Sequence, residues 1–231
     1  MATERSAAVE LLVVDDRSNH HRSCVLTLCP MRGRGTHRKT TPKVRDGKVQ
    51  KKHRWAPSRD GDAALLESAE LALEARAPGV GHRHVLSELD LRRFFPCIPD
   101  FDQFSRGLRA IVLDHEPDCL GTYHRGIIRL SSWEEDLFVE YEPEFFAEHR
   151  PTLERLGVPH DADAPRAPDD PIAVYFDERL ARAFQLVHVF VHELGHHVDR
   201  MARRRRGEDF AEAWALEMED RIWPRYRERF G

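Results

Sequence analysis

The sequence has few cysteines and no long hydrophobic run, and each shortage excludes a class of protein. Its four cysteines in 231 residues are too few for the disulfide framework of a small secreted domain. No stretch approaches the length of apolar residues, about 18, that a transmembrane helix needs. The first residues, MATERSAAVELLVVDD, lack the basic and long apolar regions of a secretory signal. We therefore expect a cytoplasmic protein with reduced thiols and no membrane partner.

Lysine is missing from most of the chain, and the charge is correspondingly uneven. All five lysines lie between residues 39 and 52. Residues 17–59 carry 13 lysines and arginines against one acid, Asp46, so this segment has a charge of +12, whereas the whole chain has −4. The segment offers too little apolar surface to offset the entropy of ordering it, so we expect residues 1–60 to form a disordered basic arm. Such an arm can contact nucleic-acid phosphates without reading sequence, or it can be a solvated tail without a specific partner.

The sequence pattern after this arm predicts an α+β domain. The segment 62–77 begins with Asp62, a capping residue, and is rich in strong helix formers, which predicts a helical linker over 61–79 that ends at Pro78. We expect the folded domain over 80–231. Spacing and turn residues predict, in order, short helices over 87–95 and 100–108, a strand over 108–114, a strand pair over 121–133, and a partly helical segment over 134–156.

The C-terminal third contains the pattern HExxH, from His192 to His196. Apolar residues recur three and four apart over 177–200, which predicts a helix with a buried stripe, and Asp177 can cap it. On such a helix His192 and His196 lie on one face, one turn apart, and both imidazoles can reach one metal ion. Glu193 lies about 100° around the helix, where it can contact a water on that metal rather than the metal itself.

This pattern carries the chemistry of zinc-assisted hydrolysis. Zinc lowers the pKa of a bound water, and the glutamate can take its proton as the water attacks a carbonyl. A chance match is the competing interpretation, but unpaired histidines and a glutamate on a buried helix are costly. Gly195 in mid-helix costs about 1 kcal/mol relative to Ala, which indicates a close approach by another element.

A second helix, predicted over 208–222, offers the third ligand. Glu208 and Glu212 lie one turn apart on one face of it. Two histidines and one carboxylate leave the fourth position of a zinc ion open for water, as catalytic zinc requires. A third histidine is the weaker alternative, because His197 points away from His196 and His188 only extends the histidine row by one turn.

The motifs HELGH and EDFAEAWA together resemble those of the gluzincin metallopeptidases. They are similar to the HExxH and Glu-x-x-Ala-Asn segments of ImmA/IrrE-type peptidases, and to the Glu-Phe-Phe-Ala-Glu pattern of lethal-factor-like peptidases. The resemblance implies a zincin-like fold, in which a small sheet precedes the active-site helix and the C-terminal glutamate helix. It also implies a zinc ion held by His192, His196 and Glu208, with Glu193 as the catalytic base and Glu212 supporting the site. Because only eleven residues separate His196 from Glu208, helix geometry keeps Glu212 open as an alternative third ligand.

The function implied by this resemblance is a zinc-dependent peptidase acting on a protein or peptide. An edge strand within 121–130 would hold the substrate by β-augmentation. Tyr123, His124 and Tyr175 are candidate donors to the oxyanion, and each is also compatible with an ordinary structural role. The basic arm and Arg203–Arg206 motivate an alternative: a nucleic-acid-associated regulator or sensor with weak or no hydrolysis. A purely structural zinc site is a third alternative, against which Glu193 argues because a structural site needs only ligands.

Overall fold

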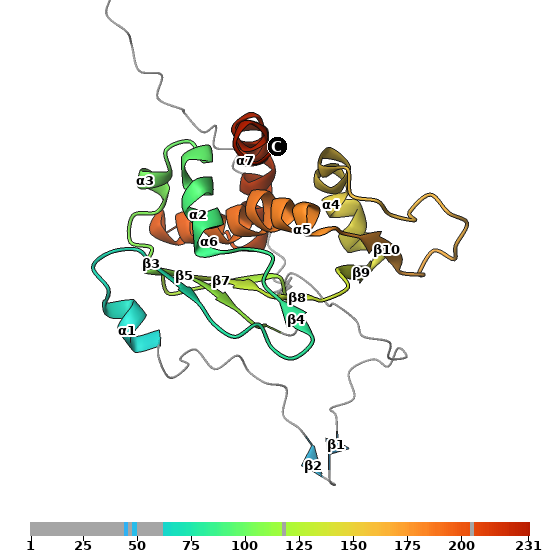
Figure 1. Ribbon diagram of the computed structural model, residues 1–231, viewed down its shortest axis with the longest axis horizontal. Coiled ribbons are helices and arrows are strands. Elements are labelled where there is room, and N and C mark those ends of the chain that lie inside the picture. The colour runs from blue at the N-terminus through green and yellow to red at the C-terminus, as the bar shows by residue number, and fades with distance from the viewer. Residues whose placement is uncertain (1–43, 46–47, 50–61, 117–118, 204–205) are drawn as a thin grey trace, which may run out of the picture.

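The computed structural model describes residues 44–45, 48–49, 62–116, 119–203 and 206–231 (Figure 1). The basic arm predicted over 1–60 therefore lies outside the described residues, except for two short strands. These strands, β1 (Val44–Arg45) and β2 (Lys48–Val49), pair antiparallel. None of the described helices combines the length and the apolar character that crossing a membrane requires.

A four-stranded mixed sheet is the central layer of this α+β fold. Its strand order is β3-β5-β7-β6, in which β3, β5 and β7 run parallel and the edge strand β6 is antiparallel to β7. Arg125 and Gly126, both with positive φ, form the two-residue turn of the β6–β7 hairpin. The strands predicted over 108–114 and 121–133 are thus confirmed. The four strands span Ala72–Ala75 (β3), Ala110–Asp114 (β5), Gly121–His124 (β6) and Ile127–Ser131 (β7).

The helix predicted over 62–77 is wrong in its second half. Helix α1 (Asp62–Glu67) is short, and the chain then continues as strand β3, which pairs with β5. The alanines and leucine of β3 favour helix in isolation, but pairing with a buried parallel strand overrides that preference. Part of the predicted helical linker over 61–79 is therefore a strand of the central sheet.

Both faces of the sheet are covered, by different helices. On one face, Leu65 of α1 packs with Ala110, Val112 and Ile127. The alternate residues of β5 and β7 point to the opposite face and join the main hydrophobic core. Figure 1 shows α2, α5 and α6 above that second face and α1 below the sheet.

One continuous helical run crosses the face of the sheet that joins the main hydrophobic core. It consists of α5 (Glu178–Phe184), the π-helical segment η2 (Gln185–Phe190) and α6 (Val191–Met201). Asp177 caps its start by accepting a hydrogen bond of 2.7 Å from the Leu180 backbone N–H, as predicted. The second predicted helix is also confirmed: α7 (Glu208–Phe230) extends beyond residue 222 to the end of the chain.

Shorter elements complete the fold. Helix α2 (Glu88–Phe94) begins at a reciprocal cap between Ser87 and Asp90, which confirms the helix predicted over 87–95. The helix predicted over 100–108 is the single turn α3 (Phe101–Phe104), because the chain reverses at Gly107, which has positive φ, before entering β5. The other elements are β4 (His82–Arg83), η1 (Phe95–Cys97), β8 (Trp133–Glu134), β9 (Phe138–Tyr141), α4 (Pro143–Leu156) and β10 (Ile172–Tyr175); β4 pairs with β8, and β9 pairs with β10.

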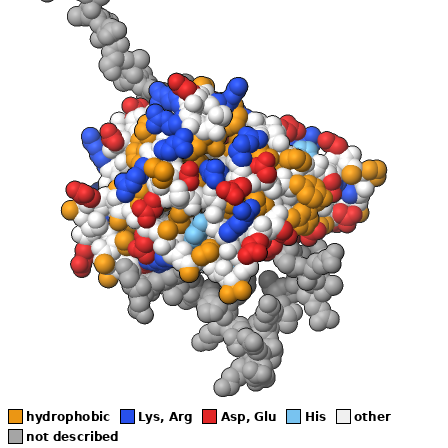
Figure 2. Space-filling model, viewed as in Figure 1, with side chains coloured by type: hydrophobic (Ala, Val, Ile, Leu, Met, Phe, Trp, Pro, Cys, Tyr) orange, Lys and Arg blue, Asp and Glu red, His pale blue; other side chains and the backbone are white. Residues whose placement is uncertain are grey.

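Acidic and basic side chains are interspersed on the face seen in Figure 2, where basic ones gather around α7. Arg93 and Arg229 fasten the end of α7 to α2. Arg93 donates to the Arg229 carbonyl at 2.8 Å, and Arg229 donates to the Arg93 carbonyl at 3.2 Å. Cations are favoured at the C-terminal end of a helix, where backbone carbonyls lack partners.

Buried ionised side chains join α1 to the sheet. Arg129 of β7 is 2% exposed and lies 2.5 Å from Asp62 and 3.7 Å from Asp114. Arg76 lies 3.5 Å and 3.3 Å from the same two carboxylates. The two arginines therefore balance two carboxylates that are almost excluded from water.

We expect Arg129→Met to lower the free energy of unfolding by about 3–5 kcal/mol, because two buried carboxylates would then share one arginine. Chemical denaturation measures this loss. The matched control is Arg83→Met, which removes an exposed pair with Glu178 at 3.0 Å and should cost no more than about 1 kcal/mol. Equal losses in the two variants would contradict a stabilising role for the buried network.

Candidate metal centre

The site depends on a close crossing of α6 and α7. A Cβ atom on Gly195 would lie 3.1 Å from Ala211 Cα and 3.1 Å from the Trp214 ring, so the prediction of a close approach at Gly195 is confirmed. Asp199 holds the connection between the helices by accepting hydrogen bonds from the backbone N–H groups of Arg206 (2.8 Å) and Gly207 (3.2 Å). The first turns of α7 therefore lie beside the HExxH segment of α6.

Two histidines of α6 and one glutamate of α7 converge to form what we call the His192 site. The Nε2 atoms of His192 and His196 lie 3.1 Å apart, and each lies 3.2 Å from Glu208 Oε2. Bonds of about 2.0–2.1 Å to a tetrahedral zinc ion place its ligand atoms about 3.3 Å apart. The triangle formed by these three atoms therefore fits a zinc ion, and its donor types are those that zinc prefers.

Glu208 and Glu212 contact opposite nitrogens of the His192 ring. Glu212 Oε2 lies 3.0 Å from Nδ1, whereas Glu208 Oε2 lies beside Nε2. A histidine that binds metal through one nitrogen commonly donates the other N–H to a carboxylate, which fixes the orientation of the ring. This geometry favours Glu208 as the third ligand and Glu212 as the support, and the assignment stays a prediction.

The protonation states of these groups follow from their contacts. Burial alone would lower the pKa of His192, but hydrogen bonds with Glu208 and Glu212 outweigh it and raise the pKa to about 10. Burial would likewise raise the pKa of both glutamates, but their hydrogen bonds to the histidines lower it to about 2 in each. Without metal, a protonated His192 ring therefore lies between two carboxylates near neutral pH.

Glu193 lies beside the ligand triangle, against the edge strand of the sheet. Its side chain is 2% exposed, and burial raises its pKa despite the nearby histidines. A Cβ atom on Gly121 of β6 would lie 2.9 Å from Glu193 Oε1 and 2.8 Å from Val189 Cγ1. Gly121 therefore leaves the space that the Glu193 carboxylate occupies, and a carboxylate with a raised pKa is a stronger base.

The three candidate oxyanion donors lie in different surroundings. The Tyr123 hydroxyl is 3.0 Å from His197 Nδ1, and His197 Nε2 is 2.9 Å from the Arg106 carbonyl. Because that carbonyl can only accept, Nε2 donates to it and Tyr123 donates to Nδ1. Tyr123 thus fastens β6 to α6. His124 follows it at the end of β6, and Tyr175 lies half exposed on β10 against Phe138.

Sequence reasoning missed two side chains next to this site, Glu219 of α7 and His149 of α4. Glu219 Oε1 lies 2.8 Å from His188 Nδ1, and the His149 ring lies 4.7 Å from the His188 ring between centroids. Glu219 continues the glutamate row of α7, just as His188 continues the histidine row of α6. The spacing of the histidines on α6 and of the glutamates on α7 could have predicted Glu219 from the sequence. His149 comes from a separate helix, and no local pattern marks it.

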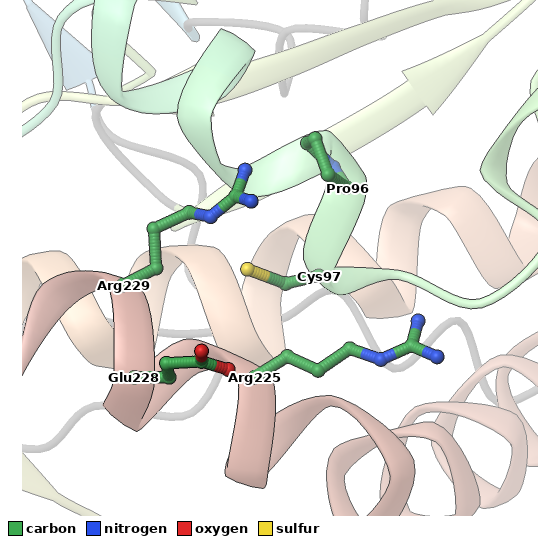
Figure 3. Close-up of a pocket in the computed structure, with 5 residues that line it drawn as sticks. All are labelled: Pro96, Cys97, Arg225, Glu228 and Arg229. Carbon is green, nitrogen blue, oxygen red and sulfur yellow. The ribbon is translucent and has the colours of Figure 1, made fainter.

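The pocket in Figure 3 lies away from these histidines. It is lined by Pro96 and Cys97 of η1 and by Arg225, Glu228 and Arg229, at the C-terminal end of α7. Glu208 is at the opposite end of the same helix, 17 residues from Arg225, or roughly 25 Å at 1.5 Å per residue. This pocket is therefore separate from the His192 site.

We expect zinc binding at the His192 site to release about one proton at pH 7, because the metal displaces the Nε2 proton of a ring whose pKa is about 10. Below that pKa the metal-free ring is protonated, so the release should persist across neutral pH and disappear as the pH rises through about 10. Calorimetric titration in buffers of different ionisation enthalpy measures it. Binding at pH 7 without proton release would contradict these protonation states.

The two glutamates should differ when each is replaced by alanine. Glu208→Ala should remove a ligand and leave zinc weakly held by two imidazoles. Glu212→Ala should lower the affinity of the His192 site by about 10–100-fold, the range for losing a partner of a ligand. Competitive chelator titration at one fixed pH, resolving each zinc equivalent, compares them with the exposed control Glu217→Ala. If Glu212→Ala is the more damaging, the assignment is reversed.

Known proteins add no further constraint to this assignment. Comparison with protein-family models, with curated proteins and with solved structures finds no match to this chain. The proposed function therefore rests on the arrangement of His192, Glu193, His196 and Glu208 and on the sheet edge beside them.

Proposed function

We propose that this protein is a zinc-dependent metallopeptidase with a zincin-like domain. The observation that carries the proposal is the triangle of His192 Nε2, His196 Nε2 and Glu208 Oε2, with the Glu193 carboxylate beside it. When bound there, zinc would supply Lewis-acid chemistry, activating water and polarising a carbonyl. Three protein ligands leave room for that chemistry, whereas structural zinc sites commonly have four.

The roles of the chain's own residues follow from their contacts. Glu193 accepts the proton of the attacking water and returns it to the leaving amine, for which its burial and raised pKa suit it. Glu212 holds the His192 ring through Nδ1, so that Nε2 faces the ligand triangle. The partly buried Tyr123–His197–Arg106 chain of hydrogen bonds keeps α6 in register with β6.

An extended peptide is the substrate class that fits this arrangement. Strand β6 is an edge strand, and a peptide can add to such an edge through backbone hydrogen bonds. Gly121, the first residue of β6, contacts Glu193, so the catalytic base lies next to that edge. A peptide bound along β6 would pass beside the group that activates water.

The basic segment supports a second candidate, a nucleic-acid-associated regulator on the same fold. Its charge of +12 over residues 17–59 is the observation that favours it. Salt-dependent DNA or RNA binding that is lost on deleting residues 1–60, together with no cleavage of any peptide, would support this candidate over the peptidase.

We expect Glu193→Gln to retain zinc and the fold while lowering peptide hydrolysis by about 10²–10⁴-fold, since the variant lacks the base. The assay is mass spectrometry of a mixture of unstructured peptides, with zinc content measured on the same samples. Glu217→Gln, an exposed change on α7, is the matched control and should keep full activity. Hydrolysis at a tenth of the wild-type rate in Glu193→Gln would exclude Glu193 as the base.

A further inference from the structure

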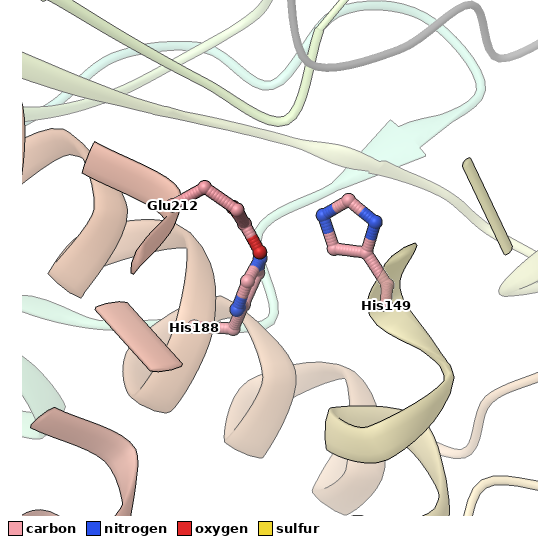
Figure 4. Close-up of side chains that lie close together, drawn as sticks. All are labelled: His149, His188 and Glu212. Carbon is pink, nitrogen blue, oxygen red and sulfur yellow. The ribbon is translucent and has the colours of Figure 1, made fainter. Parts of the chain in front are cut away.

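A second group of metal-binding side chains lies one helical turn before the His192 site. It consists of His149 of α4, His188 of η2 and Glu212 of α7 (Figure 4). One donor atom from each lies within 4.8 Å of the other two. Three separate helical elements thus direct nitrogen and oxygen donors to one point in the interior.

Three buried polar atoms of this group lack hydrogen-bond partners. They are His149 Nε2, His188 Nε2 and Glu212 Oε1. His149 is 2% exposed and His188 is fully buried. Leaving a buried polar atom without a partner costs about 1–3 kcal/mol. Such atoms are rare in folded proteins, and here three of them converge. A shared ligand would satisfy all three at once.

Hydrogen bonds fix both rings so that Nε2 carries the lone pair. His149 Nδ1 donates to the Phe145 carbonyl at 2.8 Å, and His188 Nδ1 donates to Glu219 Oε1 at 2.8 Å. The Glu219 carboxylate is itself held by the Thr152 hydroxyl, which is 2.9 Å from each of its oxygens. A neutral histidine with Nδ1–H on a carbonyl or carboxylate is the form that binds metal through Nε2.

The three unpartnered atoms do not pair with one another. His188 Nε2 is 3.7 Å from the nearest Glu212 oxygen, which is too long for a hydrogen bond. Acidic side chains surround the group, since the carboxyl groups of Glu212 and Glu219 both lie against His188.

We propose that His149, His188 and Glu212 form a second metal site, which takes zinc or another divalent cation that prefers imidazole and carboxylate ligands. Glu219 and the Phe145 carbonyl orient the two imidazoles by accepting hydrogen bonds from their Nδ1 atoms. Thr152 and Arg155 in turn hold Glu219, with Arg155 at 3.5 Å. The site goes beyond the proposed peptidase function and does not depend on it.

Glu212 links the two sites. Its Oε2 contacts His192 Nδ1 and lies 3.7 Å from His188 Nε2, while its buried Oε1 has no hydrogen-bond partner. A cation held by Oε1 would fix the carboxylate and, through it, the orientation of the His192 ring. Loss of the second ion should therefore weaken zinc binding at the His192 site by about 10–100-fold, as for the loss of any group that orients a ligand.

The test is the zinc content of the full chain after loading and removal of free metal, measured by elemental analysis. Wild type should hold two zinc ions per chain. The double variant His196→Ala/Glu208→Ala, which disables the His192 site, should hold one. His149→Phe should also hold one, because phenylalanine fills the space and can keep the stacking on Phe145. The triple variant, which combines His149→Phe with the double variant, should hold none. His160→Phe is the matched control, a histidine packed on Phe146 outside both groups, and should hold two.

The double variant decides the proposal on its own if His149→Phe does not fold, as checked by circular dichroism. One zinc ion in the double variant supports the second site, and none overturns it. In a folded triple variant, a zinc ion that remains overturns the assignment to His149. None of these outcomes depends on peptide hydrolysis, so the site can stand even if the proposed peptidase activity fails, and the reverse also holds.

Discussion

The close contact of α6 with α7 at Gly195 is the constraint on which the rest of the site depends. It lets the histidine row of α6, at residues 188, 192 and 196, face the glutamate row of α7, at residues 219, 212 and 208. The rows run in opposite directions: α6 ends at Met201, α7 begins at Glu208, and Asp199 of α6 holds the backbone just before α7. Any larger side chain at Gly195 would push Ala211 and Trp214 away, and the carboxylates with them.

The central sheet also positions the site, through contacts between its edge strand and α6. Edge strand β6 contacts α6 twice, through the hydrogen bond of Tyr123 to His197 and through the space that Gly121 leaves for Glu193. These contacts fix the orientation of α6 above the sheet, so that Glu193 faces the strand edge while His192 and His196 face α7. In the proposed peptidase, a substrate that pairs with the strand would therefore reach Glu193 and the His192 site together. This is the physical basis for preferring a peptide as substrate.

The sequence predicted the parts of the site that local geometry controls. A four-residue spacing places His192 and His196 on one helical face, and the same spacing relates Glu208 to Glu212, whatever the rest of the chain does. Tertiary packing controls the parts that were missed. Strand β3 has the composition of a helix and is a strand because β5 pairs with it. His149 reaches His188 only because α4 packs beside the helical run of α5 and η2, which no spacing in the sequence reveals.

A crystal structure of the zinc-loaded chain, with anomalous scattering recorded on both sides of the zinc edge, tests the central claim most directly. The account predicts an anomalous peak about 2.0–2.2 Å from His192 Nε2, His196 Nε2 and a Glu208 oxygen, with the Glu193 carboxylate outside bonding distance. A chain that takes up no zinc, or a peak bonded to Glu212 and His192 Nδ1 in place of this triangle, would contradict it.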